Sequence, residues 1–196
     1  MGNPLQDRRT AAEFASVGQL IEFTEKISSF EGLAAIVEAD LAALDPDKMP
    51  TEWRDSAICG ELKFGFLDAS GGVPTVSGKA AAEVDAVCQR CLEPFRLTLN
   101  IEPNLLLLNE EQADDGYEEL EVWELEEAML QPLDIVEELL IMAMPLSAMH
   151  DSMADCRAFL PDDTSQDVSS DTSAEDLLKP FAALRSQMTQ NEKDPG

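Results

Sequence analysis

Basic residues are scarce in this chain, and one long part of it has none. The 196 residues include 13 Lys and Arg against 40 Asp and Glu, so the formal net charge at pH 7 is -27. No Lys or Arg occurs in residues 97–156. Affinity for nucleic acids and anionic membranes depends on basic side chains, which displace counterions from phosphates. The charge therefore disfavours extensive direct contact with RNA. It either suits a basic protein partner or serves solubility alone.

Long apolar runs are also missing from the sequence. The longest stretch, LLIMAMPLSAM at residues 139–149, is too short to cross a bilayer and contains Pro145. The first residues, MGNPLQDRRTAAEF, lack the apolar core of a secretory signal. We therefore expect a cytoplasmic protein without a membrane partner. In that reducing compartment, cysteines are more often metal ligands, catalytic groups or core residues than disulfides.

The residue patterns of common enzymes are not found. The sequence has a single histidine, no Gly-rich phosphate loop and no nucleophile elbow. Acidic residues are so numerous that no particular pair stands out as general acid and base. We expect no enzymatic activity and no small-molecule substrate.

Apolar spacing predicts helices in the first part of the chain and again near Pro132. Residues 16–44 carry apolar side chains at steps of three and four, which predicts two helices, or one bent helix, around Gly32. PLDIVEELLIMAMP predicts a second helical region that begins with Pro132 and ends before Pro145.

Alternating residues predict strands between these helical regions. ICGELKFGFLDA places Leu62, Phe64 and Phe66 on one side of a strand, and VSGKAAAEVDAVC and FRLTLNIEPNLLLL continue the pattern. An acidic loop then leads into a short edge strand at residues 120–125. The prediction is an α+β fold, with one domain over residues 1–156 in which helices pack on one face of an antiparallel sheet.

The composition changes after Cys156. The stretch LPDDTSQDVSSDTSAED is rich in Ser and Asp and poor in apolar residues, which predicts a disordered acidic tail over residues 157–196. A short apolar motif near residues 177–188 includes Phe181 and Leu184. It is either a frayed or folded-back end, or a linear motif that docks on a partner as an amphipathic helix.

Two of the four cysteines lie close together in VCQRCLEPF. Cys88 and Cys91 have the CxxC spacing that supplies two thiolates to Zn²⁺ from a tight turn, here at a predicted hairpin end. The segment HDSMADC adds His150 and Cys156 from a predicted loop after the Pro132 helix. These four residues predict a zinc site, either Cys₃His or three cysteines with another fourth ligand. Cys59 lies in an alternating apolar strand and is predicted to be a core residue.

Other interpretations of the same residues stay open. The thiols could be unligated, or they could form a redox dithiol, although that chemistry usually places CxxC at a helix N-terminus in a βαβ unit. Arg90 and Arg96 flank the turn. They either form surface ion pairs of small energetic value or make a small positive site that contacts an RNA phosphate.

Three of these segments resemble motifs of the YceD family, the large ribosomal RNA subunit accumulation proteins of bacteria and plastids. VCQRCLEPF is similar to the family's central C-x-RC-L-x-PF signature. LDIVEELLIMAMPLSAMHDSMADC resembles its second block, and KPFAALRSQM resembles its C-terminal motif. The resemblance carries cysteine positions of the family onto Cys88, Cys91 and Cys156, and a histidine position onto His150. It supplies no catalytic residues.

The resemblance implies a non-enzymatic cytoplasmic factor for accumulation or processing of large-subunit ribosomal RNA and for ribosome assembly. Combined with the acidity, it favours action through a basic ribosomal protein or an assembly factor, with ribosomal RNA affected indirectly. One alternative is a zinc-knuckle protein that binds RNA directly through Arg90 and Arg96. Another is a CxxC thiol redox protein.

Overall fold

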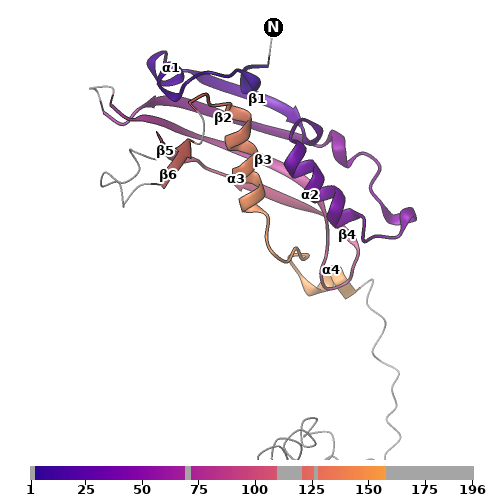
Figure 1. Cartoon of the computed structure of the whole chain (residues 1–196). Coiled ribbons are helices and arrows are strands. Elements are labelled where there is room, and N and C mark those ends of the chain that lie inside the picture. Colours follow the sequence, from indigo (N-terminus) through magenta and orange to yellow (C-terminus); the bar gives the residue numbers. More distant parts are fainter. Residues whose placement is uncertain (1–2, 69–71, 110–120, 126–127, 158–196) are drawn as a thin grey trace, which may run out of the picture. The chain divides into compact units, whose positions relative to one another are not determined.

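The computed structural model describes residues 3–68, 72–109, 121–125 and 128–157 (Figure 1). These residues belong to the unit Met1–Leu160, and the unit Pro161–Gly196 lies outside them. The predicted tail, including Phe181 and Leu184, therefore falls outside the described residues and stays a prediction. None of the described helices is long and apolar enough to cross a membrane.

The described elements are short helices and six strands. The α-helices are α1 (Ala11–Ser16), α2 (Glu31–Leu41), α3 (Pro132–Ala143) and α4 (Met153–Arg157). The strands are β1 (Leu20–Lys26), β2 (Ala57–Phe66), β3 (Pro74–Val87), β4 (Pro94–Ile101), β5 (Asn104–Asn109) and β6 (Glu121–Leu125). The 3₁₀ turns are η1 (Pro4–Gln6), η2 (Ile27–Ser29), η3 (Pro46–Lys48) and η4 (Trp53–Asp55).

The strands form one sheet in the order β1-β2-β3-β5-β6, and β4 also pairs with β3. The predicted α+β class and the predicted edge strand near residues 120–125 are confirmed. The prediction of a wholly antiparallel sheet is wrong, because β6 pairs with β5 in parallel. Strand direction depends on the path of the connecting chain, which the alternation of apolar residues does not encode.

The long strand β3 organises the sheet. One of its edges pairs with β2. The other edge pairs with β5 at residues 75–77 and with β4 at residues 80–87. The register is continuous, because Ala80 lies opposite Ile101 and Ser77 opposite Asn104. Between these pairs the amide of Gly78 donates to the carbonyl of Pro103 at 3.0 Å. Since Pro103 has no N–H to return, β4 and β5 are two parts of one extended run that proline interrupts.

One face of the sheet holds the hydrophobic core. Helices α2 and α3 lie side by side over this face (Figure 1), and Phe14 of α1 stacks on Phe64 of β2 with ring centroids 4.8 Å apart. Alternate residues of β2, such as Ile58 and Leu62, point inward and are fully buried. The prediction that Cys59 is a core residue is wrong. Cys59 is exposed, because neighbouring residues of a strand point to opposite faces.

The predicted helical region over residues 16–44 divides into a strand and a helix. β1 pairs with β2 through Leu20–Lys26, and its Ile21 and Phe23 are buried while Glu22 is exposed. Only the later part, from Glu31, is helical. The apolar residues of this stretch fit both a two-residue and a three- to four-residue period, and pairing with β2 selects the strand.

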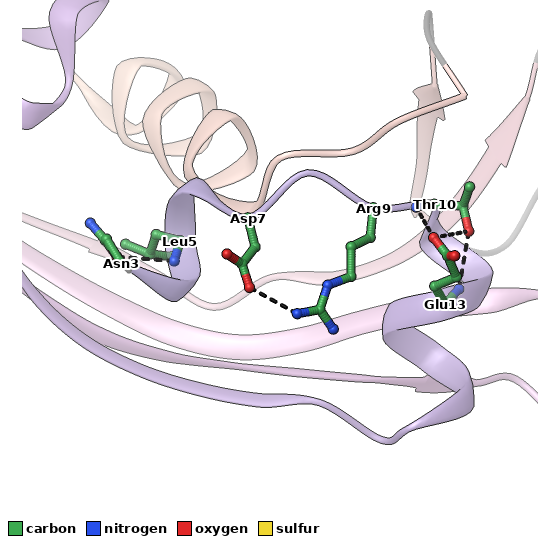
Figure 2. Close-up of polar contacts among 6 residues, drawn as sticks. All are labelled: Asn3, Leu5, Asp7, Arg9, Thr10 and Glu13. Carbon is green, nitrogen blue, oxygen red and sulfur yellow. Dashed lines mark hydrogen bonds and ion pairs between the residues drawn. The ribbon is translucent and has the colours of Figure 1, made fainter. Parts of the chain in front are cut away.

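The N-terminal segment is fixed by local hydrogen bonds (Figure 2). Thr10 and Glu13 form a reciprocal capping box at the start of α1, and the Arg9 side chain pairs with Asp7 at 2.9 Å. The Arg9 backbone exchanges two hydrogen bonds with Leu130, at 3.2 and 2.7 Å. These bonds attach the segment to the residues that lead into α3.

A side chain of α3 completes the start of α2. The N-cap of α2 is Phe30, which provides no side-chain hydrogen bond. Instead, Glu137 Oε1 accepts from the amides of Gly32 at 2.5 Å and Leu33 at 3.0 Å. The carboxylate thereby satisfies amides that have no partner within the helix and offsets the positive end of the helix dipole.

We predict that Gly78→Ala strongly destabilises the fold. A Cβ at this position would lie 2.1 Å from the carbonyl oxygen of Glu61, which is backbone and cannot swing away. Separating β2 from β3 there should cost about 2–3 kcal/mol, which corresponds to roughly 5–10 °C in Tm for a chain of this size. Thermal unfolding followed by circular dichroism measures the change.

Gly65→Ala in the same strand pair is the matched control, because the nearest atom to its Cβ would be 3.8 Å away. We expect it to change Tm by no more than about 2 °C. Equal effects of the two substitutions would show that the close approach at Gly78 does not limit the fold.

Candidate metal centre

Cys88 and Cys91 lie in the connection between β3 and β4. The two strands are paired up to Val87 and Pro94, so the connection is a tight hairpin turn. Within it the Cys88 amide donates to the Glu93 carbonyl at 3.0 Å, and the Leu92 amide donates to the Cys88 carbonyl at 2.8 Å. Leu92 has φ +59°, the left-handed conformation that lets the chain reverse so sharply. The turn directs both cysteines toward one point.

The other two residues come from the segment that follows α3. His150 precedes the five-residue helix α4, which carries Cys156. The prediction of a loop without regular structure is therefore wrong for Cys156, because one helical turn is too short to show an apolar period. Two hydrogen bonds attach this segment to the hairpin. The Gln89 amide donates to the Ala148 carbonyl at 2.9 Å, and the Arg90 guanidinium donates to the His150 carbonyl.

The ligand atoms of Cys88, Cys91, His150 and Cys156 all lie within 4.8 Å of one another, and this is the one such group among the described residues. The sulfurs of Cys88 and Cys156 are 3.8 Å apart. His150 Nδ1 is 3.5 Å from the sulfur of Cys91 and 3.5 Å from that of Cys156. A tetrahedral Zn²⁺ with bonds of about 2.3 Å to sulfur and about 2.0 Å to nitrogen requires separations of roughly 3.8 Å between sulfurs and roughly 3.5 Å between sulfur and nitrogen. These three separations match those values, so the cluster could hold a four-coordinate ion.

The surroundings hold the ligand side chains in place. Cys88 and Cys156 are fully buried, whereas Cys91 and His150 are half-buried. The His150 ring packs on Phe95, with centroids 4.8 Å apart and an interplanar angle of 40°. This contact leaves Nδ1 facing the sulfurs of Cys91 and Cys156, so the packing on Phe95 sets the orientation of the imidazole.

The thiols of the cluster differ in acidity. Burial acts to raise the pKa of Cys88, but the backbone N–H groups of Cys91, His150 and Arg90 outweigh it and lower the pKa to about 5. Burial raises the pKa of Cys156 to about 11, and the neighbouring cysteines add to that effect. A bound divalent cation would remove this difference, because metal coordination deprotonates every coordinating thiol.

The two arginines proposed as RNA contacts are both engaged within the protein. Arg90 is bound to the His150 carbonyl, and its charge favours the thiolate form of Cys156. Arg96 Nε is 3.1 Å from Asp85 Oδ1, and its Nη1 donates to the Ser56 hydroxyl at 2.8 Å. Burial raises the pKa of the Asp85 carboxyl, and Arg96 offsets part of this rise. These contacts use part of the hydrogen-bonding capacity of each arginine and reduce what it can offer to a phosphate.

Sequence reasoning missed the residue that anchors the base of the hairpin. Asp40 of α2 accepts the amide hydrogen of Val87 at 2.7 Å, immediately before Cys88. Lys48 pairs with Glu93 on the other side of the turn. Nothing in the sequence distinguishes Asp40 from the other acidic residues, because its role depends on the packing of α2 against β3.

The fold and the cluster together define a class: an α+β protein in which a CxxC hairpin and a histidine- and cysteine-bearing segment close one four-residue site. A family model described as "Large ribosomal RNA subunit accumulation protein YceD" matches residues 76–186, and all four cluster residues fall within this range. The match covers more than half of the chain. The chain belongs to the YceD family.

A curated relative gives further support. The large ribosomal RNA subunit accumulation protein YceD of Haemophilus influenzae is 42% identical over 81 residues, which cover 39% of this chain and 45% of that protein. The chain thus spans about half the length of this relative. No solved structure matches the chain significantly.

Proposed function

We propose that this protein is a non-enzymatic cytoplasmic factor for the accumulation and processing of large-subunit ribosomal RNA, acting in ribosome assembly through a protein partner. The observation that carries the proposal is the family match over residues 76–186, which includes the hairpin, α3 and the complete cluster. The similarity to the Haemophilus influenzae YceD protein, which covers a shorter span, is consistent with the proposal.

The proposed role of the cluster is to hold one structural Zn²⁺. Three thiolates and one imidazole are ligands that zinc prefers, and four protein ligands leave no open position for a substrate. This closed site supports a non-enzymatic role. Three thiolates outweigh the two charges of the ion, so the site would carry one net negative charge. Arg90, whose charge acts on Cys156, is placed to balance it.

The proposed partner is a basic ribosomal protein or an assembly factor, with ribosomal RNA affected indirectly. The net charge of -27 and the lack of Lys and Arg in residues 97–156 support this choice over direct RNA contact. The internal contacts of Arg90 and Arg96 point the same way, because they reduce what either side chain can offer to a phosphate.

We predict that cells lacking this protein accumulate less large-subunit ribosomal RNA relative to small-subunit RNA. The measurement is the ratio of the two mature RNAs in the source organism, with the gene deleted and then restored. The small-subunit RNA is the internal control. An unchanged ratio in the deletion strain would overturn the proposed function.

We predict about one zinc per chain in protein purified without added metal, measured by elemental analysis. Cys88→Ser and Cys156→Ser should each reduce the zinc content and lower Tm by about 5–10 °C, because the ion ties the hairpin to the segment after α3. His150→Ala should have a smaller effect, since water can take the fourth position.

Cys59→Ser is the matched control for the zinc prediction. Cys59 is exposed and does not belong to the cluster, so its substitution should leave the zinc content and Tm unchanged. Titration of the native protein with a thiol reagent, with and without chelator, also tests the redox alternative. Three thiols that react only after chelation support ligation. Metal-free protein in which the Cys88 variant keeps its Tm would contradict it.

We predict weak binding of naked ribosomal RNA at physiological salt and tighter binding of at least one basic large-subunit protein. Electrophoretic mobility and pull-down assays with RNase treatment compare the two. Arg96→Gln should leave RNA binding unchanged, since this arginine is paired with Asp85. A tight RNA complex whose affinity falls steeply with salt and is reduced by Arg96→Gln would instead favour direct RNA binding.

A further inference from the structure

A groove runs between the edge strand β6 and the exposed side of α3, away from the metal centre. On one side it is lined by four consecutive residues of β6, from Val122 to Leu125. On the other side it is lined by residues that precede α3 and by a stripe of α3 itself, and Arg8 of the N-terminal segment closes the lining. Asp134, Glu138 and Met142 form the stripe at every fourth position.

The groove borders the outer edge of β6. Successive residues of a strand point to opposite faces, so a hollow lined by four consecutive residues reaches both sides of the strand and includes its edge. The sheet order ends at β6, and no other strand of the described part of the chain pairs with its outer edge. The backbone groups on that edge are the hydrogen-bonding groups to which another strand adds.

The chemistry of the lining combines apolar contact with negative charge. Trp123 and Leu125 are half-buried against the core, whereas Met129 and Met142 are 44% and 64% exposed. The lining includes three carboxylates, those of Glu124, Asp134 and Glu138, and one guanidinium, that of Arg8. Exposed Met side chains adapt to varied apolar partners.

We propose that this groove binds an extended segment of a basic partner protein, in which basic and apolar residues alternate, and that the segment adds to β6 as a further strand. The proposal rests on the proposed function, whose protein partner it describes. Alternation matches the geometry, because one set of side chains would face the apolar wall while the other reaches the carboxylates.

Charge argues against other occupants of the groove. A second copy of this chain would also carry a net charge of -27, and like charges oppose association. Nucleic acids and anionic membranes are repelled by the same carboxylates. A competing explanation is that Glu121 and Glu124 only protect the edge strand from aggregation, as charged residues on edge strands often do.

The test uses the full chain and a fluorescent synthetic peptide of four Lys-Val repeats as the probe. We expect saturable binding at physiological salt, measured by anisotropy. Glu124→Lys with Glu138→Lys should weaken binding about tenfold or more, because both contacts become repulsive. Both residues are exposed, so the double variant should fold normally. Met142→Ser should weaken binding without any change of charge.

Matched controls separate local recognition from overall charge. Glu22→Lys with Glu83→Lys makes the same charge change at exposed positions outside the groove, and we expect less than a twofold effect. Hydrogen exchange should slow in Glu121–Leu125 when the peptide is bound, since strand addition protects edge amides. Equal loss in the two double variants, or binding without protection of β6, would overturn the groove proposal.

A cell experiment distinguishes failure of this inference from failure of the proposed function. In the deletion strain, the wild-type chain should restore the ratio of large- to small-subunit RNA, whereas the Glu124→Lys, Glu138→Lys variant should not. Restoration by both chains would overturn the groove proposal and leave the proposed function intact. If the deletion itself changes nothing, the proposed function fails, and the peptide assay still decides whether the groove binds a basic strand.

Discussion

The pairing of β3 on both of its edges is the constraint on which the rest of the structure depends. One edge holds β2 and, through it, β1, and the other holds β4 and β5 in a single register. Gly78 permits the approach of β2, because any side chain there would meet the Glu61 carbonyl. The same register brings β4 back beside the end of β3, so the position of Cys88 follows from the pairing of the whole strand.

The candidate metal centre depends on this frame but has its own electrostatic problem. It brings together a thiol with its pKa lowered to about 5 and another with its pKa raised to about 11, so the thiols cannot all ionise by themselves at neutral pH. A bound divalent cation would remove this conflict and make the arrangement favourable. Because the ligands come from β3's hairpin and from the segment after α3, binding one ion would couple two regions that are distant in sequence.

Much of the fold and of the cluster could be predicted from the sequence. Chemistry alone identified the four residues of the cluster, since the single histidine and three of the four cysteines fall in two short segments. Periodicity identified α3 and the central strands but failed for β1, where Ile21 and Phe23 fit two periods and only a neighbouring strand decides. The parallel direction of β6 and the role of Asp40 could not be predicted, because both depend on distant contacts.

The Glu137 contact with α2 has a consequence for the boundaries of the folded domain. The family match begins within β3, so β1, β2 and α2 lie outside it while α3 lies inside. Glu137 nevertheless caps α2, and β2 covers a full edge of β3. The matched region is therefore not structurally self-contained. The amides at the start of α2, which lie outside the match, are satisfied by a carboxylate about a hundred residues later in the chain.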